Sequence, residues 1–158
     1  MEYFYDVSSN ITMITDSRNR KIIRFEYDIL NRLRKKIFPT GAQVSYDYDP
    51  AGNLIKVTDP KGAAVEYDYY DNGWLKTVTS PAGVSFFEYN TSGDILKITL
   101  PDGNSIGYMW YLDHSLRWVS YPGSGTVETG YDLFGDVRWI EDAMGNRSGV
   151  RYDMLRQV

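Results

Sequence analysis

The sequence predicts an all-β protein made of tandem repeats of about 21 residues, with two antiparallel strands in each repeat. Three observations support this fold class. A motif led by Tyr or Trp recurs at a nearly constant interval, and two turn signals divide each interval into short strands. Aromatic residues make up 15% of the chain, with fourteen tyrosines, which favours strand over helix. We expect the strands to form one long sheet that curves or spirals, because open twisted sheets seldom exceed about ten strands.

Eight aromatic residues mark the repeat starts: Tyr5, Tyr27, Tyr48, Tyr69, Tyr89, Trp110, Tyr131 and Tyr152. Seven whole repeats and the start of an eighth fill residues 1–158, and no Pro/Gly/Ser-rich linker separates them. We therefore expect a single array of about fourteen strands. Because the chain begins and ends within a repeat, we also expect it to be a fragment of a longer protein.

The fifth residue of each repeat is predicted to occupy a tight turn with a positive φ. It is Gly52, Gly73, Gly93 and Gly135 in four repeats, and Ser9, Asn31 and His114 in the other three. Gly and Asn adopt positive φ at low cost, and His is also enriched there. We interpret His114, the only histidine, as a turn residue in preference to a catalytic or metal-binding one, because no second histidine could assist it.

Two apolar residues follow this turn at the seventh and tenth positions, such as Leu54 and Val57. Their separation of three does not match the alternation of a regular strand. We expect the seventh residue to pack under the turn, or a β-bulge to lie between the two. The second repeat departs from the pattern, with Leu33 and Lys36.

A second turn is predicted where proline occupies the thirteenth position and glycine follows two residues later. Pro presets φ for a turn corner, and Gly accepts a conformation that other residues avoid. The prolines are Pro39, Pro60, Pro81, Pro101 and Pro122, and the glycines are Gly41, Gly62, Gly83 and Gly103. The seventh repeat keeps Gly145 after Ala143, and the first has Ser17 and Asn19.

An aromatic ladder is expected along the second strands, because residues two apart share one face of a strand. Its members include Tyr27, Tyr48, Tyr67, Tyr69, Tyr89, Trp110 and Tyr131. Rings on neighbouring strands would form cross-strand contacts. The preference for Tyr over Phe indicates that the hydroxyl either reaches a partner, such as backbone, or faces water.

Composition and charge argue against several classes of function. The net charge is −4, with basic and acidic residues scattered singly, which disfavours nucleic-acid binding. The chain has no cysteine and no apolar stretch of the roughly 20 residues that span a bilayer, so we expect no thiolate metal site and no membrane insertion. No signal peptide, phosphate-binding glycine loop or hydrolase motif is found. We expect no catalytic, cofactor-binding or metal-binding residue, and no enzyme.

Three local patterns could suggest a chemical function: paired aspartates, a calcium site and a glycosylation site. Paired aspartates, such as Asp47 with Asp49 or Asp68 with Asp71, could serve a glycosidase, but Asp recurs at the turns of most repeats, whereas a catalytic pair is needed once. No closely spaced run of calcium ligands occurs. Residues 90–92, Asn-Thr-Ser, match the N-glycosylation pattern.

Glycan binding is the main alternative that the residues leave open. Tyr and Trp faces stack on sugar rings, and three tryptophans lie off the ladder: Trp74, Trp118 and Trp139. Other repeats have small or polar residues at these places, so no repeated sugar site is evident. Structural packing is the preferred interpretation of all three.

The motif Y-D-x-x-G-N-L-x-x-V-x-D-P-x-G, ending in Y-x-Y-D, resembles the YD repeat of the Rhs family, which is shared with insecticidal toxin complexes and animal teneurins. It is clearest in residues 48–83. The resemblance implies a β-ribbon that spirals into a hollow shell, which encloses a C-terminal toxin in bacterial members and serves adhesion in teneurins. It also implies a self-cleaving segment at the end of the bacterial shells, and this chain has no counterpart to that segment.

The expected function is therefore that of a non-enzymatic structural fragment of a shell, secreted or at the cell surface of a bacterium. Its expected partners are the rest of the shell and the enclosed C-terminal domain. Exposed sheet edges are expected to support self-association. The alternative is an extracellular repeat module that binds a glycan or a protein in adhesion.

Overall fold

The computed structural model describes residues 1–16, 18 and 21–152, and every regular element in them is a β-strand. Contacts between Cα atoms divide the chain into two units, Met1–Ala82 and Gly83–Val158. We describe each unit by itself. Whether the repeats form one continuous array stays a prediction. In the described part of the chain, no helix is long and apolar enough to cross a membrane.

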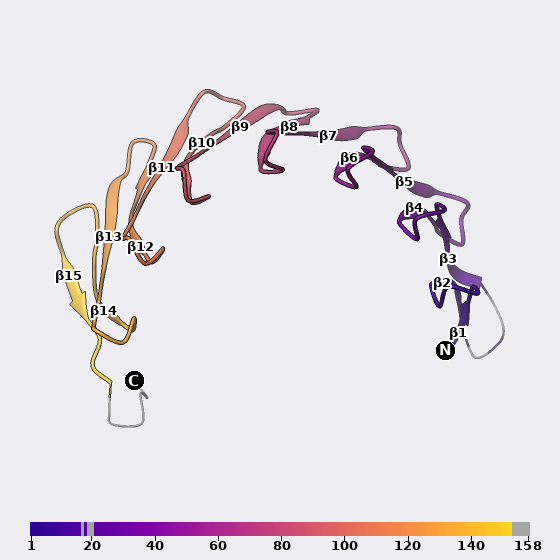
Figure 1. The fold of residues 1–158 in the computed structure, drawn as a ribbon, viewed down its shortest axis with the longest axis horizontal. Helices are drawn as coiled ribbons and strands as arrows, with labels where there is room; N and C mark the ends of the chain where they lie inside the picture. Colours follow the sequence, from indigo (N-terminus) through magenta and orange to yellow (C-terminus); the bar gives the residue numbers. More distant parts are fainter. Residues whose placement is uncertain (17, 19–20, 153–158) are drawn as a thin grey trace. The chain divides into compact units, whose positions relative to one another are not determined.

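Unit 1 is an antiparallel meander in which strands that follow one another in the chain are neighbours in the sheet (Figure 1). First turns lie at one end of the strands, and second turns lie at the opposite end. Its strands are β1 (Glu2–Tyr5), β2 (Ile11–Thr15), β3 (Lys21–Tyr27), β4 (Leu33–Ile37), β5 (Gln43–Tyr48), β6 (Leu54–Thr58), β7 (Ala64–Tyr69) and β8 (Leu75–Ser80).

Unit 2 repeats the same topology. Its strands are β9 (Gly83–Tyr89), β10 (Ile95–Thr99), β11 (Ser105–Trp110), β12 (Leu116–Tyr121), β13 (Gly125–Tyr131), β14 (Val137–Glu141) and β15 (Arg147–Gly149). The predicted all-β class and antiparallel pairing are confirmed. The described residues contain fifteen strands, one more than expected, because Glu2–Tyr5 forms a strand ahead of the first full repeat.

A β-bulge interrupts the first hairpin of every repeat, which confirms one of the two expected explanations for the spacing of three. In the third repeat Tyr48 pairs with Leu54 while Asp47 pairs with Lys56, so Ile55 has no residue opposite it on β5. The extra residue returns Leu54 and Val57 to one face of β6. The equivalent extra residues are Thr12, Arg34, Ile55, Lys76, Leu96, Arg117 and Arg138.

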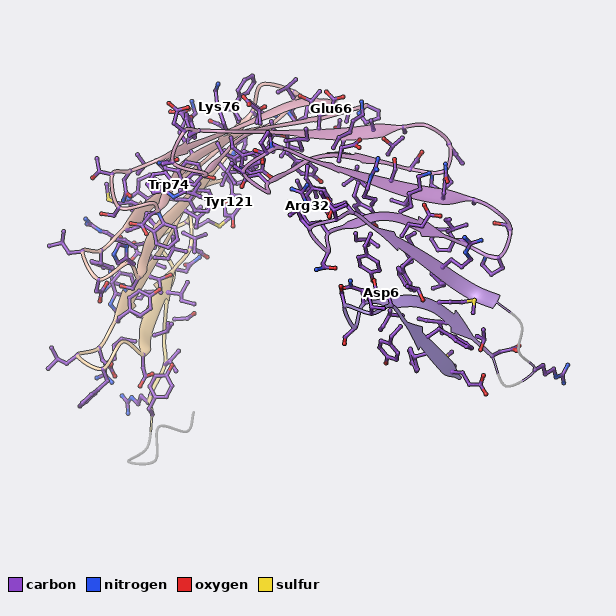
Figure 2. The ribbon with its side chains drawn as sticks, turned by 45° about the vertical axis from the view of Figure 1, so that its right-hand side comes forward. Asp6, Arg32, Glu66, Trp74, Lys76 and Tyr121 are labelled. Atoms are coloured by element: carbon purple, nitrogen blue, oxygen red, sulfur yellow. The ribbon has the colours of Figure 1, made fainter. Side chains whose placement is uncertain are left out.

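The two faces of each meander differ in chemistry. On what we call the aromatic face, Tyr46 lies opposite Val57, and Val57 lies opposite Val65. On what we call the charged face, Asp47, Lys56 and Glu66 follow one another across three strands. Side chains project from both sides of the strands (Figure 2). Because no second layer covers either face, the side chains of the aromatic face must shield one another.

Solvent exposure shows how open this single layer is. The chain exposes 11151 Å², whereas a folded monomer of 18.2 kDa would expose about 8,100 Å². Val119, at 9% exposure, is the one apolar side chain classed as buried among the described residues. Tyrosines and aliphatic residues of the aromatic face are mostly half-buried. The fold is therefore stabilised by strand pairing, turn hydrogen bonds and lateral ring packing, because it has no closed core.

Candidate functional site: a repeated turn and its aromatic cap

In four repeats the first turn is closed by hydrogen bonds that a single aspartate organises. In the third repeat the backbone N–H of Asp49 donates to the carbonyl of Asn53 at 2.9 Å, and the N–H of Gly52 donates to the carbonyl of Asp49 at 3.1 Å. The Asp49 carboxylate accepts from the Asn53 backbone N–H at 2.8 Å and from its side-chain amide at 2.9 Å. The carboxylate therefore replaces backbone partners that the tight turn cannot supply.

The same arrangement recurs with Asp6, Asp28 and Asp132, and Asn90 performs it with its amide oxygen. These hydrogen bonds stabilise the ionised carboxylate, so they lower the pKa of Asp6, Asp28 and Asp49. The repetition supports a structural role for these residues.

Every predicted turn glycine adopts a positive φ. Gly52 has a φ of 98°, and in the first-turn row Ser9, Asn31 and His114 adopt values of 66°, 61° and 65°. The interpretation of His114 as a turn residue is thereby confirmed. The other predicted turn glycines also have positive φ: Gly41, Gly62, Gly73, Gly83, Gly93, Gly103, Gly135 and Gly145.

Side chains also link the first turns of successive repeats. The Asn10 amide donates to the Asn31 side-chain oxygen at 2.9 Å, and His114 Nδ1 lies 2.8 Å from a carboxylate oxygen of Asp94. The Arg32 guanidinium donates to the carbonyl of Asp49 at 3.1 Å. Each of these contacts joins residues of consecutive repeats, so the turns form a polar row along one edge of each sheet. Sequence reasoning missed this row, because no single repeat contains both partners.

In three repeats the tyrosine that opens the repeat caps the bulge of the repeat before it. The Tyr69 hydroxyl donates to the carbonyl of Leu54 at 2.8 Å, and the Tyr48 hydroxyl donates to that of Leu33 at 2.9 Å. Pairing between β6 and β7 ends at Lys56 and Glu66, so the Tyr69 hydroxyl satisfies a carbonyl beyond the paired segment. Of the two outcomes expected for the tyrosine hydroxyl, these residues show the backbone partner, and it is the carbonyl of the seventh residue.

Other members of the ladder follow the same rule. The Tyr27 hydroxyl donates to the carbonyl of Ile11 at 2.9 Å, and Trp110 uses its indole N–H to reach that of Ile95 at 2.7 Å. Burial raises the pKa of the ladder tyrosines Tyr27, Tyr48, Tyr69 and Tyr131. Tyr89 lies at the same repeat position in β9, and Tyr67 lies on the aromatic face beside Tyr69.

Ring contacts also occur along the ladder. Tyr108 stacks on Trp110 along one strand, with ring centroids 6.4 Å apart. Tyr111 meets Tyr131 edge to face at 6.1 Å. Hydroxyl-to-carbonyl hydrogen bonds and ring contacts thus both occur in the ladder.

The second turns have the predicted proline corner. Pro60, Pro81 and Pro101 each lie in a turn, two residues ahead of a glycine with positive φ. A Cβ on Gly83 would lie 2.8 Å from Pro101 Cβ, and one on Gly125 would lie 2.8 Å from Ala143 Cβ. Adjacent second turns thus pack directly on each other in unit 2. Ser17 and Asn19 of the first repeat lie outside the described residues.

The charged face carries an ion pair in most repeats. Lys56 lies 2.7 Å from Glu66, and Lys76 lies 3.3 Å from Asp68. These side chains are about half exposed, so each pair adds little stability. Asp68 is therefore engaged with a lysine and Asp49 with its turn, and the predicted preference for structural aspartates over a glycosidase pair agrees with these contacts. Within the described residues, no group of three His, Cys, Asp or Glu side chains could hold a metal.

The three off-ladder tryptophans are half-buried. Trp139 lies over Gly130, where an added Cβ would be 2.2 Å from the ring, and the Arg147 guanidinium lies 3.8 Å from the ring centroid. A Cβ added to Gly107 would lie 3.5 Å from the Trp118 ring, so Trp118 also packs beside a glycine. Trp74 ends a first turn, where its backbone N–H donates to the side-chain oxygen of Asn72. These contacts favour the packing interpretation, and glycan binding by the three tryptophans stays untested.

Comparison with known protein families identifies the family to which these repeats belong. The model of the teneurin YD-shell matches residues 1–153, nearly the whole chain. The chain belongs to this YD-shell family. None of the curated proteins matches it in sequence. The predicted kinship with Rhs/YD-repeat proteins is confirmed, and the family is one of structural shells, with no catalytic family indicated.

Solved structures of toxin complexes share the fold of this YD-shell chain. It matches a TcdB2-TccC3 structure with a TM-score of 0.75, at 14% identity, over 98% of this chain and 10% of the other. The related TcdB2-TccC3-TEV structure gives 0.76 at 14% identity, with the same coverage. The Tc holotoxin pore of Photorhabdus luminescens gives 0.69 at 15% identity, over 93% of this chain and 9% of the other. This YD-shell chain thus spans about a tenth of the length of these proteins.

Proposed function

We propose that this chain is a wall segment of a secreted or cell-surface shell that encloses and delivers a C-terminal toxin domain. The carrying observation is the agreement of the YD-shell family match with the fold of the TcdB2-TccC3 structures. The contacts support a wall: the turn aspartates, bulges and ladder tyrosines of each repeat are engaged in holding strands together. In this proposal its partners are the rest of the shell and the enclosed domain.

Enclosure can be tested by protease access in the full-length protein. A protease recognition site would be inserted near the C-terminus, and a control site would be inserted at the exposed first turn around Ala51. We expect the C-terminal site to resist the protease until mild denaturant opens the shell, while the control site is cut at once. Equal cutting of both sites in native protein, or a full-length chain with no further repeats, would overturn the proposal.

An adhesion module that binds a glycan or a protein is the alternative. The packing of Trp139 between Gly130 and Arg147 argues against sugar stacking on that ring. A glycan array with the purified chain separates the two functions, because a wall segment binds no sugar and an adhesin binds a defined class. Self-association through sheet edges stays a prediction, and light scattering over a range of concentrations measures it.

A further inference from the structure

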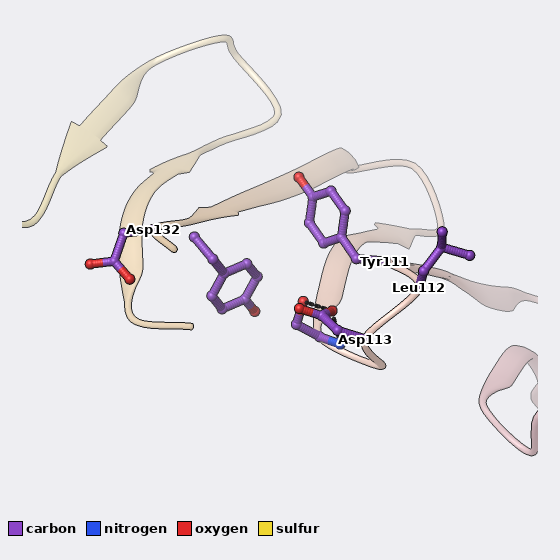
Figure 3. A pocket seen from close by; sticks show the side chains of 6 residues that line it. Tyr111, Leu112, Asp113 and Asp132 are labelled. Atoms are coloured by element: carbon purple, nitrogen blue, oxygen red, sulfur yellow. Dashed lines mark hydrogen bonds between the residues drawn. The ribbon is translucent and has the colours of Figure 1, made fainter. Parts of the chain in front are cut away.

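A hollow in unit 2 opens at the sixth repeat, where the repeat pattern fails. Most first turns open with Asp or Asn, but the sixth opens with Tyr111. The hollow has a volume of about 440 Å³, and its lining includes Tyr111, Asp113, Tyr131 and Asp132. Such a volume falls within the range of small-ligand sites. Figure 3 shows Tyr111 and Asp113 on one side of the hollow and Asp132 on the other.

The two tyrosines of the hollow form a fixed right-angled pair. Their planes meet at 87°, with ring centroids 6.1 Å apart. The Tyr111 hydroxyl lies 3.5 Å from the carbonyl of Thr129. Rings at right angles can present π faces to a cation from two directions.

Carboxylates give the hollow a negative potential. Asp113 uses one oxygen to accept from the Ser115 backbone N–H at 3.0 Å and from its hydroxyl, and no hydrogen bond to its second oxygen is found in the described residues. The Ser115 hydrogen bonds lower the pKa of Asp113, so it is ionised at neutral pH. Asp132 adds a second carboxylate to the lining.

The net charge of unit 2 also favours a cationic ligand. Residues 83–158 hold ten acidic and six basic residues, whereas residues 1–82 hold eleven of each, so unit 2 carries the whole net charge of −4. The Arg117 guanidinium lies 5.8 Å from the Tyr111 ring centroid, near the outer limit for a cation–π contact. Arg117 also lies 3.3 Å from Glu128, which holds it on the charged face.

We propose that the hollow bounded by Tyr111, Tyr131 and Asp113 binds an alkylammonium group, either a lysine side chain of a polypeptide or a small quaternary amine. The tyrosine faces attract the cation, and the second oxygen of Asp113 accepts a hydrogen bond from a primary ammonium. A phosphate-bearing amine is disfavoured because Asp113 and Asp132 would repel it. This site lies within unit 2 and does not depend on the shell proposal.

The test is a titration of the 158-residue chain, followed by NMR of its tyrosine ring protons. The probes are N-acetyl-lysine methylamide, choline, phosphocholine and the neutral isostere of choline in which carbon replaces nitrogen. We expect saturable binding of at least one cation, weaker binding of phosphocholine and none of the neutral isostere. The stronger cation distinguishes a peptide ligand from a small amine. No saturable binding of either cation, or equal binding of the neutral isostere, overturns the proposal.

Two variants locate the site without disturbing the turn. Tyr111→Asn installs the residue that the fifth repeat already uses at this place, Asn90, so the turn should fold. We expect it to weaken cation binding roughly 2- to 30-fold, the worth of a cation–π contact. Asp113→Asn should also weaken binding, while the matched control Asp102→Asn removes an equal charge from a second turn and should not. Unchanged binding in Tyr111→Asn contradicts the assignment.

Discussion

Replacing Tyr69 by Phe should destabilise unit 1 by about 1 kcal/mol, the net worth of one neutral hydrogen bond. The substitution removes the hydroxyl that donates to the carbonyl of Leu54 at 2.8 Å and keeps the ring. That carbonyl lies beyond the last β6–β7 pair, formed by Lys56 and Glu66, so that pairing offers no replacement donor. Its surroundings are only partly buried, so water can take over in part, which keeps the loss near 1 kcal/mol rather than at the 2–3 kcal/mol of a buried orphan.

Urea unfolding followed by circular dichroism measures this loss. With a urea m-value of about 2 kcal/mol/M, the midpoint should fall by about 0.5 M. Repeat arrays need not unfold in one step, so hydrogen exchange should accompany the urea experiment and show faster exchange of the β6 and β7 amides. The control is Tyr67→Phe on the same strand and face, because no hydrogen bond of its hydroxyl is found in the described residues. Equal loss in both variants, or no loss in Tyr69→Phe, would refute the capping role.

Three further predictions concern the packing, the tyrosines and the turns. Gly130→Ala should destabilise unit 2 by roughly 1–3 kcal/mol, because the new Cβ would overlap the Trp139 ring. The control Gly107→Ala should be tolerated, because its Cβ would lie 3.5 Å from the Trp118 ring, an ordinary contact distance. Thermal unfolding compares the two variants, and equal losses of stability would contradict the packing of Trp139 on Gly130. The ladder tyrosines Tyr48 and Tyr69 have raised pKa values, so their stabilisation is complete below pH 10 and is lost as the pH rises through the folded pKa. Tyrosinate absorbance and circular dichroism should therefore change together in an alkaline titration, and ionisation without unfolding would argue against this. Asp49→Ala should lower the urea midpoint more than Asp49→Asn, because Asn keeps the oxygen that accepts from the turn; equal shifts would contradict this.

The turn aspartates should make the chain less stable at low pH, whereas the ladder tyrosines make it less stable at high pH. The lowered pKa of Asp49 means that its stabilising effect is present above the unfolded value of 3.8 and is lost as the pH falls through the folded pKa. An acid titration of the wild-type chain and Asp49→Asn should therefore converge at low pH. Persistence of the difference below the folded pKa would show that charge is not the cause.

Repetition made most of this fold predictable from the sequence. The positions of Gly52 and Pro60 fix two turns, and the three-residue separation of Leu54 and Val57 indicates a bulge once it recurs in every repeat. The partner of the Tyr69 hydroxyl was not predictable in detail, because it depends on how far β6 and β7 pair before they part. Lys36 looked like an error in the pattern, yet its ammonium lies 5.3 Å from the Phe38 ring, which lets it share the aromatic face.

The candidate binding site was hidden from the sequence for a different reason. Repetition identifies what every repeat needs, so a residue that departs from the pattern is first interpreted as a tolerated error. Tyr70 and Tyr111 both replace the turn aspartate, and each has a basic side chain of its own repeat about 6 Å from its ring. They differ in their neighbours, because Tyr111 meets Tyr131 at a right angle beside Asp113, and a hollow opens between them. In a wall whose regular residues are committed to holding strands, specific recognition falls to such departures, and their neighbours in the next repeat decide which of them can bind.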